Sequence, residues 1–72
     1  MTDEETKALG RAAKKAKRIA SERASELHDL VEDRLPAAYE DLPEVARATY
    51  DACREWALAE ARLKAAEAGA QV

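Results

Sequence analysis

The first half of the chain carries apolar residues at the spacing of one long amphipathic helix. At about 100° per residue they fall in a single band about 160° wide. The members of this band are Leu9, Ala12, Ala13, Ala16, Ile19, Ala20, Ala24, Leu27, Leu30, Val31 and Leu35. Thr2 and Glu5 have the spacing of a capping box, which predicts that the helix begins at about Asp3.

Two prolines mark where this helix ends and where a second one begins. Pro36 disfavours helical geometry at the residue before it, so the first helix should end near Arg34. Pro43 suits the first turn of a second helix that has Asp41 as its N-cap. Gly69 suits the position just past the end of that helix. The apolar positions between them step by four and three residues, which is a heptad seam: Val45, Thr49, Ala52, Trp56, Ala59, Leu63 and Ala66.

These elements predict an all-α fold with a single domain over residues 1–72. The first helix should span about 3–34, the loop about 35–41 and the second helix about 42–68. Two helices of similar length joined by a short segment lie antiparallel, as a helical hairpin. The apolar band is wider than one partner helix can cover, so the hairpin should form a homodimer or a dimer of dimers, as a four-helix bundle. We expect Trp56 to anchor a dimer core made of Leu27, Val31, Val45, Trp56 and Leu63.

Alanine dominates the apolar residues, which makes a stable lone hairpin hard to build. Of 34 apolar residues 18 are alanine, so sixteen side chains larger than a methyl group are left for a core. Self-association is one way for so short a chain to complete a core. The chain has no phenylalanine, two glycines and two prolines, a composition that argues against a β sandwich or barrel.

Positive charge is concentrated in the first half of the first helix. The formal net charge of −3 is too small to favour nucleic acid or a membrane surface by itself, yet residues 7–18 hold six cations and no acid. Antiparallel packing places them beside the carboxyl-terminal half of the second helix, which is a structural explanation. An outward-facing basic stripe could instead contact RNA phosphates; it consists of Lys7, Arg11, Lys14 and Arg18. No aromatic residue lies between them to stack on bases, so we expect weak RNA binding.

The carboxyl-terminal end of the first helix is acidic, although the helix dipole disfavours acids there. His28 and Glu32 share a face that could form half of a divalent-metal site, with iron as a candidate, completed by a second subunit. Position 25 is Ser25, so the Glu-x-x-His signature of di-iron bundles is missing. An ion pair or a solvated face explains the same residues without a ligand. We expect no required cofactor, and a partner or a weakly held metal ion at His28, Asp29, Glu32 and Asp33.

The sequence shows no arrangement typical of an enzyme. Cys53 is the one cysteine, with no histidine near it, and no nucleophile–base pair or phosphate-binding loop is present. Residues 2–5 are polar or acidic, and no apolar run approaches about 18 residues, so we expect no signal peptide and no membrane helix. We therefore predict a non-enzymatic cytoplasmic protein.

Three short runs in the middle of the chain resemble one known family. They read LHDLVEDRLP at 27–36, YEDLPEVA at 39–46 and TYDA at 49–52. They are similar to runs in the small Rop-like proteins encoded in nitrogen-fixation operons, and the resemblance covers roughly Leu27 to Trp56. Arg34 is one residue more than the first run of that family contains.

The resemblance implies a self-associating helical hairpin with a role in nitrogenase maturation or in its supply of metal or electrons. The partners it implies are nitrogenase-assembly proteins, which we expect to bind the acidic end of the first helix and the loop. It carries no catalytic residue. The alternative function is an RNA-binding hairpin that uses the basic stripe.

Overall fold

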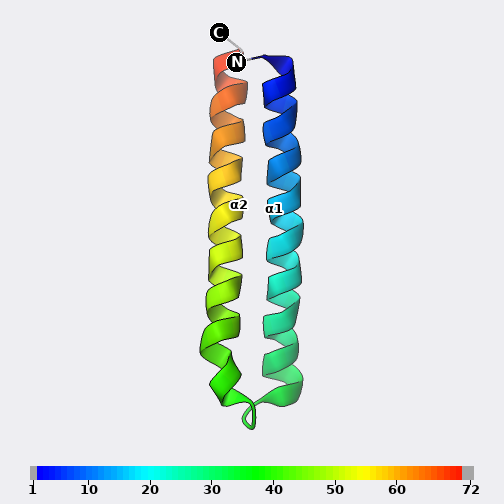
Figure 1. The fold of residues 1–72 in the computed structure, drawn as a ribbon, viewed down its shortest axis with the longest axis vertical. Coiled ribbons are helices and arrows are strands. Elements are labelled where there is room, and N and C mark those ends of the chain that lie inside the picture. The colour runs from blue at the N-terminus through cyan, green and yellow to red at the C-terminus, as the bar shows by residue number, and fades with distance from the viewer. Residues whose placement is uncertain (1, 71–72) are drawn as a thin grey trace.

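The computed structural model describes residues 2–70 as an antiparallel helical hairpin, which confirms the predicted fold class. Its elements are α1 (Asp3–Asp29), a π-helical turn η1 (Leu30–Arg34), a 3-10 turn η2 (Tyr39–Asp41) and α2 (Leu42–Ala70). The two long helices lie side by side, with the loop at one end of the molecule and both described chain ends at the other (Figure 1). The molecule is therefore long and thin, at 55 × 14 × 12 Å.

Thr2 fixes the start of α1. Its hydroxyl oxygen accepts a hydrogen bond from the backbone N–H of Glu5 at 3.2 Å, and its own backbone is extended. This bond satisfies one of the N–H groups that have no partner in the first helical turn. The hydroxyl half of the predicted capping box is thus in place.

The first helix ends in a π-helical turn. The N–H of Leu35 donates to the carbonyl of Leu30 at 3.0 Å, which spans five residues where an α-helix spans four. Leu35 is extended, as expected before a proline, and the Leu35–Pro36 peptide bond is cis. A π-helical turn takes in one more residue than an α-helical turn, which fits the extra residue Arg34. The apolar pattern gave no sign of this change.

The two signals predicted for the ends of α2 are wrong in detail. Asp41 belongs to the 3-10 turn that runs directly into α2, so helical geometry begins before Asp41 and this residue is not the N-cap. Gly69 lies inside α2, and no described glycine has a positive φ. Gly69 therefore lacks the left-handed backbone of a glycine that ends a helix.

The hairpin buries little of its apolar surface. Among the side chains that the structure describes, Leu30, Ala13 and Ala66 are buried, with 0%, 4% and 4% exposed, and Leu30 alone is large. The accessible surface is 5628 Å², whereas a compact monomer of 7.9 kDa has about 4,400 Å². The excess of about 1,200 Å² is larger than the roughly 800 Å² that each partner contributes to a standard interface.

The seam between the helices follows heptad steps on both sides. The half-buried or buried seam residues are Thr6, Leu9, Ala13, Ala16, Ala20, Leu27 and Leu30 on α1, and Leu42, Val45, Thr49, Ala52, Ala59, Leu63 and Ala66 on α2. Arg23 and Trp56 complete the two series, yet both are exposed. Trp56, predicted as the core anchor, is 36% exposed in the hairpin because the facing seam residues of α1 are mostly alanine and leave its ring at the edge.

Thr49 links the two helices by a hydrogen bond. Its hydroxyl lies 3.1 Å from the carbonyl oxygen of Arg23 on α1 and 2.9 Å from that of Val45 on its own helix. Within residues 2–70 this is the one side-chain hydrogen bond recorded between α1 and α2. It therefore ties the backbone of α1 at Arg23 to a side chain of α2.

We expect Thr49→Val to lower the free energy of unfolding by about 0.5–1.5 kcal/mol, because valine keeps the shape but loses the donor. Urea unfolding followed by circular dichroism measures this. Thr6→Val is the control, since the Thr6 hydroxyl donates only to the Thr2 carbonyl of its own helix. Equal losses in the two variants would mean that the link between the helices contributes nothing of its own.

Candidate functional site

The residues predicted to bind a partner lie together where α1 meets the π-helical turn. We call His28, Asp29, Glu32 and Asp33 the acidic end. His28 Nδ1 lies 3.7 Å from Asp29 Oδ1, and His28 Nε2 lies 3.5 Å from Glu32 Oε1. These three side chains are more than 60% exposed, and Asp33 is exposed as well. Three of the four residues are therefore in contact, and all four face solvent.

In a single chain this end is a cluster of exposed polar side chains and not a metal site. Across residues 2–70, no group of three or more His, Cys, Asp or Glu side chains is arranged to hold a metal ion. A metal at His28 would need ligands from a second subunit. Exposed pairs such as His28 with Glu32 add at most about 1 kcal/mol to stability, so the fold does not need these residues for its own sake.

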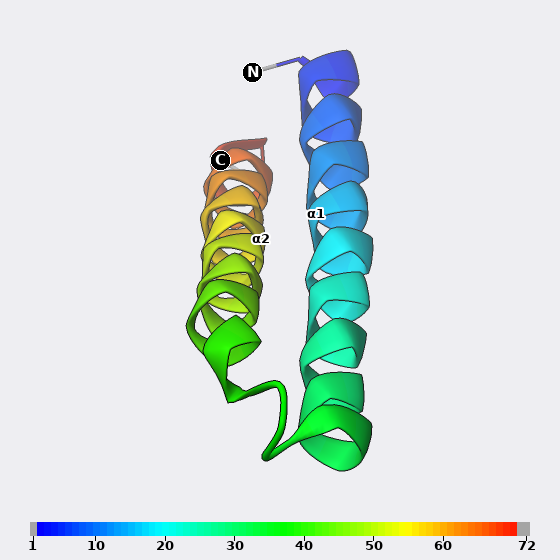
Figure 2. The same ribbon diagram turned by 60° about the horizontal axis from the view of Figure 1, so that its bottom comes forward.

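Two apolar side chains are exposed beside the acidic end. Val31 in the π-helical turn is 54% exposed, and Tyr39 at the start of the 3-10 turn is 64% exposed. Figure 2 turns this end of the molecule forward and shows the last turn of the first helix leading through the loop into α2. Tyr39 is the aromatic residue that precedes the LPE run, and the periodicity of the apolar residues does not point to it. Single exposed apolar side chains are common on protein surfaces, whereas π-helical turns often occur at functional sites.

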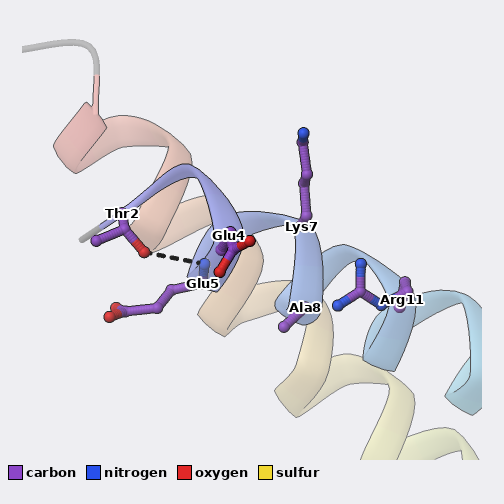
Figure 3. A pocket seen from close by; sticks show the side chains of 6 residues that line it. All are labelled: Thr2, Glu4, Glu5, Lys7, Ala8 and Arg11. Atoms are coloured by element: carbon purple, nitrogen blue, oxygen red, sulfur yellow. Dashed lines mark hydrogen bonds between the residues drawn. The ribbon is translucent and has the colours of Figure 1, made fainter.

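The basic stripe lies on α1, and its four residues are exposed. Lys7 and Arg11 line a shallow depression together with Glu4 and Glu5 (Figure 3). Arg18 Nε lies 3.9 Å from Glu22 Oε1 on the same helix. Glu4 and Glu5 therefore add negative charge near the amino-terminal half of the stripe.

We expect RNA binding by the basic stripe to be weak at about 0.15 M salt, because nearby acids oppose it and no aromatic side chain lies along it. Filter binding to a structured RNA measures this. Sub-micromolar affinity that disappears in Lys14→Glu with Arg18→Glu would contradict the expectation and favour the RNA-binding alternative.

Two apolar grooves run between α1 and α2 at the same distance along the hairpin. They have different lining residues, so they lie on opposite sides of the hairpin, which we call flanks. One groove lies on the side that we call the Ile19 flank, and its lining residues are Ala12, Lys15, Ala16, Ile19, Ala52 and Glu55. The other groove lies on the side that we call the Trp56 flank, and its lining residues are Lys17, Ala20, Ser21, Ala24, Cys53 and Trp56. A further groove at Leu9, Arg62 and Gly69 continues the Ile19 flank, because Glu55, Arg62 and Gly69 are seven residues apart. Both flanks leave apolar surface open.

The predicted dimer-core residues are divided between the seam and one flank. Leu27, Val45 and Leu63 are half-buried in the seam. Val31 and Trp56 are more exposed, and both belong to the Trp56 flank, since Val31 follows Ala24 by seven residues. All five therefore keep some surface that a second molecule could cover.

No helix in the described part of the chain is long and apolar enough to cross a lipid bilayer. Comparisons with curated proteins and with solved structures gave no match. The Rop-like family model matches residues 4–68, which include nearly all of both helices and the loop. Rop-like hairpins are helical interaction modules that oligomerise as bundles and are generally non-enzymatic. Because the match covers most of a 72-residue chain, this protein belongs to the Rop-like family.

Proposed function

We propose that this Rop-like chain is a non-enzymatic cytoplasmic interaction protein that forms a homodimer and binds a partner through its acidic end and loop. The observation that carries the proposal is the unfinished core. A hairpin that buries one large side chain and exposes about 1,200 Å² more than a compact monomer is completed by association. A second copy would cover the open sides of seam residues such as Leu27, Val45 and Leu63.

The chemistry of the acidic end indicates what kind of partner it fits. Its carboxylates favour a basic surface, and the neighbouring Val31 and Tyr39 favour apolar contacts within that surface. The acids lie at the negative pole of α1, where lysine would have stabilised the helix better. A binding role explains why acids stand at that position, whereas helix formation does not.

The runs that resemble Rop-like proteins of nitrogen-fixation operons support a nitrogenase-assembly protein as the partner. The first of these runs, at 27–36, contains the whole acidic end and the π-helical turn. The hairpin would then assist nitrogenase maturation or its supply of metal or electrons by holding partners together. The basic stripe as an RNA site is the weaker alternative, because Glu4 and Glu5 lie beside Lys7 and Arg11.

The test neutralises two acids of this end without removing volume. We expect Asp29→Asn with Asp33→Asn to stabilise the isolated protein by a few tenths of a kcal/mol, since it relieves repulsion with the helix dipole. The same variant should lose nitrogenase-assembly proteins that the parent retains in pulldowns from cells grown on dinitrogen. Thermal unfolding and mass spectrometry of the retained proteins measure the two effects.

Glu60→Gln with Glu67→Gln is the matched control, because it removes the same charge from the far half of α2. It should retain the partners. If the asparagine variant is clearly less stable and still retains every partner, the acids are structural and the proposed binding site is wrong.

A further inference from the structure

We propose that the outward face of α2 binds an acidic amphipathic helix of a partner protein, at a patch formed by Tyr50, Arg54 and Leu58. By the outward face of a helix we mean the positions that point away from the seam. The patch is separate from the acidic end and from any surface between two copies of the hairpin, so the inference goes beyond the proposed function. It follows from a difference between the outward faces of the two helices.

The outward face of α1 is polar, whereas that of α2 is largely apolar. Heptad spacing from the seam gives twelve outward positions in residues 4–29 of α1, and Ala8 is the one apolar residue among them. Ten outward positions lie in residues 47–68 of α2, and all ten are exposed. Six of these ten are apolar: Tyr50, Ala57, Leu58, Ala61, Ala65 and Ala68. A helix that is apolar all round is normally buried, so a helix that is apolar on two opposite faces has a second face to cover.

Two large apolar side chains and one arginine follow each other along this face. Tyr50 is 60% exposed and Leu58 is 39% exposed, and a separation of eight residues places them about 12 Å apart along the helix axis. Arg54 lies midway, so the three form one row at i, i+4 spacing. A single exposed apolar side chain needs no partner. A row that combines Tyr and Arg has the residue types that are enriched at the centre of protein interfaces.

The charges of the patch indicate that its partner is acidic. Asp51 is the one acid at the outward positions of residues 47–68, and it lies 3.2 Å from Arg47, between Oδ1 and Nε. Arg47 is also held against Tyr50, with its guanidinium carbon 5.6 Å from the ring centroid. Among residues 2–70 this is the one ion pair recorded for a cation of α2, so Arg54 keeps its charge for a carboxylate from outside the chain.

The patch stays open when the hairpin associates through either flank. Tyr50, Arg54 and Leu58 do not line the grooves of the Ile19 flank or the Trp56 flank. RNA fits this patch poorly, because Leu58 and the alanines beside it offer no positive charge or hydrogen bond to a phosphate. An amphipathic helix fits it well, since its apolar residues can cover Tyr50 and Leu58 while its carboxylates reach Arg54.

A synthetic peptide tests the proposal on the unmodified protein. The probe has about 18 residues, or about five helical turns, with leucine on one face and glutamate along both borders. The matched probe has lysine in place of every glutamate. In an NMR titration of the ¹⁵N-labelled protein, we expect the glutamate peptide to shift the amide signals of Tyr50, Arg54 and Leu58, and the lysine peptide to leave them unchanged. The absence of these shifts, or shifts confined to the six cations of residues 7–18, would overturn the proposal.

A substitution separates the patch from general charge attraction. We expect Arg54→Glu with Leu58→Gln to weaken binding of the glutamate peptide at least about tenfold. Helical content and sedimented mass should not change, since both side chains are exposed. Ala8→Gln with Arg11→Glu makes the same charge change on the outward face of α1 and should retain the binding.

The acidic end does not enter these measurements, so their failure would leave the proposed function standing. An equal loss of binding in the Ala8→Gln with Arg11→Glu control would overturn the proposed patch. A single-stranded RNA that binds more tightly than the glutamate peptide and shifts the same amide signals would overturn it as well.

Discussion

Replacing Leu30 with alanine is expected to lower the free energy of unfolding by about 2–5 kcal/mol. Among the side chains that the structure describes, Leu30 is the one large side chain that is completely enclosed, at 0% exposed. Its carbonyl also accepts the hydrogen bond that closes the π-helical turn, so the side chain and backbone of one residue fix this end of the molecule. A chain of this size has a total stability of about the same magnitude, so the variant should be largely unfolded at low concentration.

Leu58→Ala is the control for this prediction, because it removes the same atoms from a side chain that is 39% exposed. We expect it to cost about 1 kcal/mol or less. Urea unfolding at one fixed protein concentration compares the two, since association shifts the apparent stability. Similar losses at both positions would mean that the hairpin has no enclosed core at Leu30.

The second large effect is expected at Trp56, where replacement with alanine should cost about 2–3 kcal/mol. Truncating a tryptophan that is wholly inside a core lowers the free energy of unfolding by about 3–5 kcal/mol. We expect a smaller loss here because 36% of Trp56 is exposed in the hairpin. Its ring lines a groove together with Ala20 and Ala24 of α1 and Cys53 of its own helix, so truncation removes apolar surface from between the two helices.

Tyr50→Ala, at a position that is 60% exposed, is the matched aromatic control and should cost about 1 kcal/mol or less. A loss below about 1 kcal/mol for Trp56→Ala would place the ring on the surface. A loss above about 4 kcal/mol that shrinks on dilution would mean that a second copy covers the ring of Trp56.

The fold class could be predicted from the sequence because each signal is local. The spacing of apolar residues predicts two helices, Thr2 starts the first one, and Pro36 requires an extended residue before it. The π-helical turn could not be predicted in this way, since it depends on how one extra residue is accommodated against α2. The position of Arg34 in the resembling run was the only signal of it.

The sequence indicates which residues could form the candidate site. It does not indicate how exposed the side chains around them are. The contact of His28 with Glu32 follows from the i, i+4 spacing of a helix, whereas that of His28 with Asp29 does not. The exposure of Tyr39 depends on the loop, and that of Trp56 depends on how closely two alanine-rich helices approach. Periodicity placed Trp56 in the heptad series of α2, but it does not say how much of a large ring fits between small residues.

Sedimentation equilibrium of the unmodified protein at tens of micromolar tests the central claim most directly. If the hairpin completes its core by association, the measured mass should be at least twice the chain mass of 7.9 kDa, and helical content should fall as the protein is diluted. A folded, fully helical monomer whose stability does not change with concentration would contradict the claim.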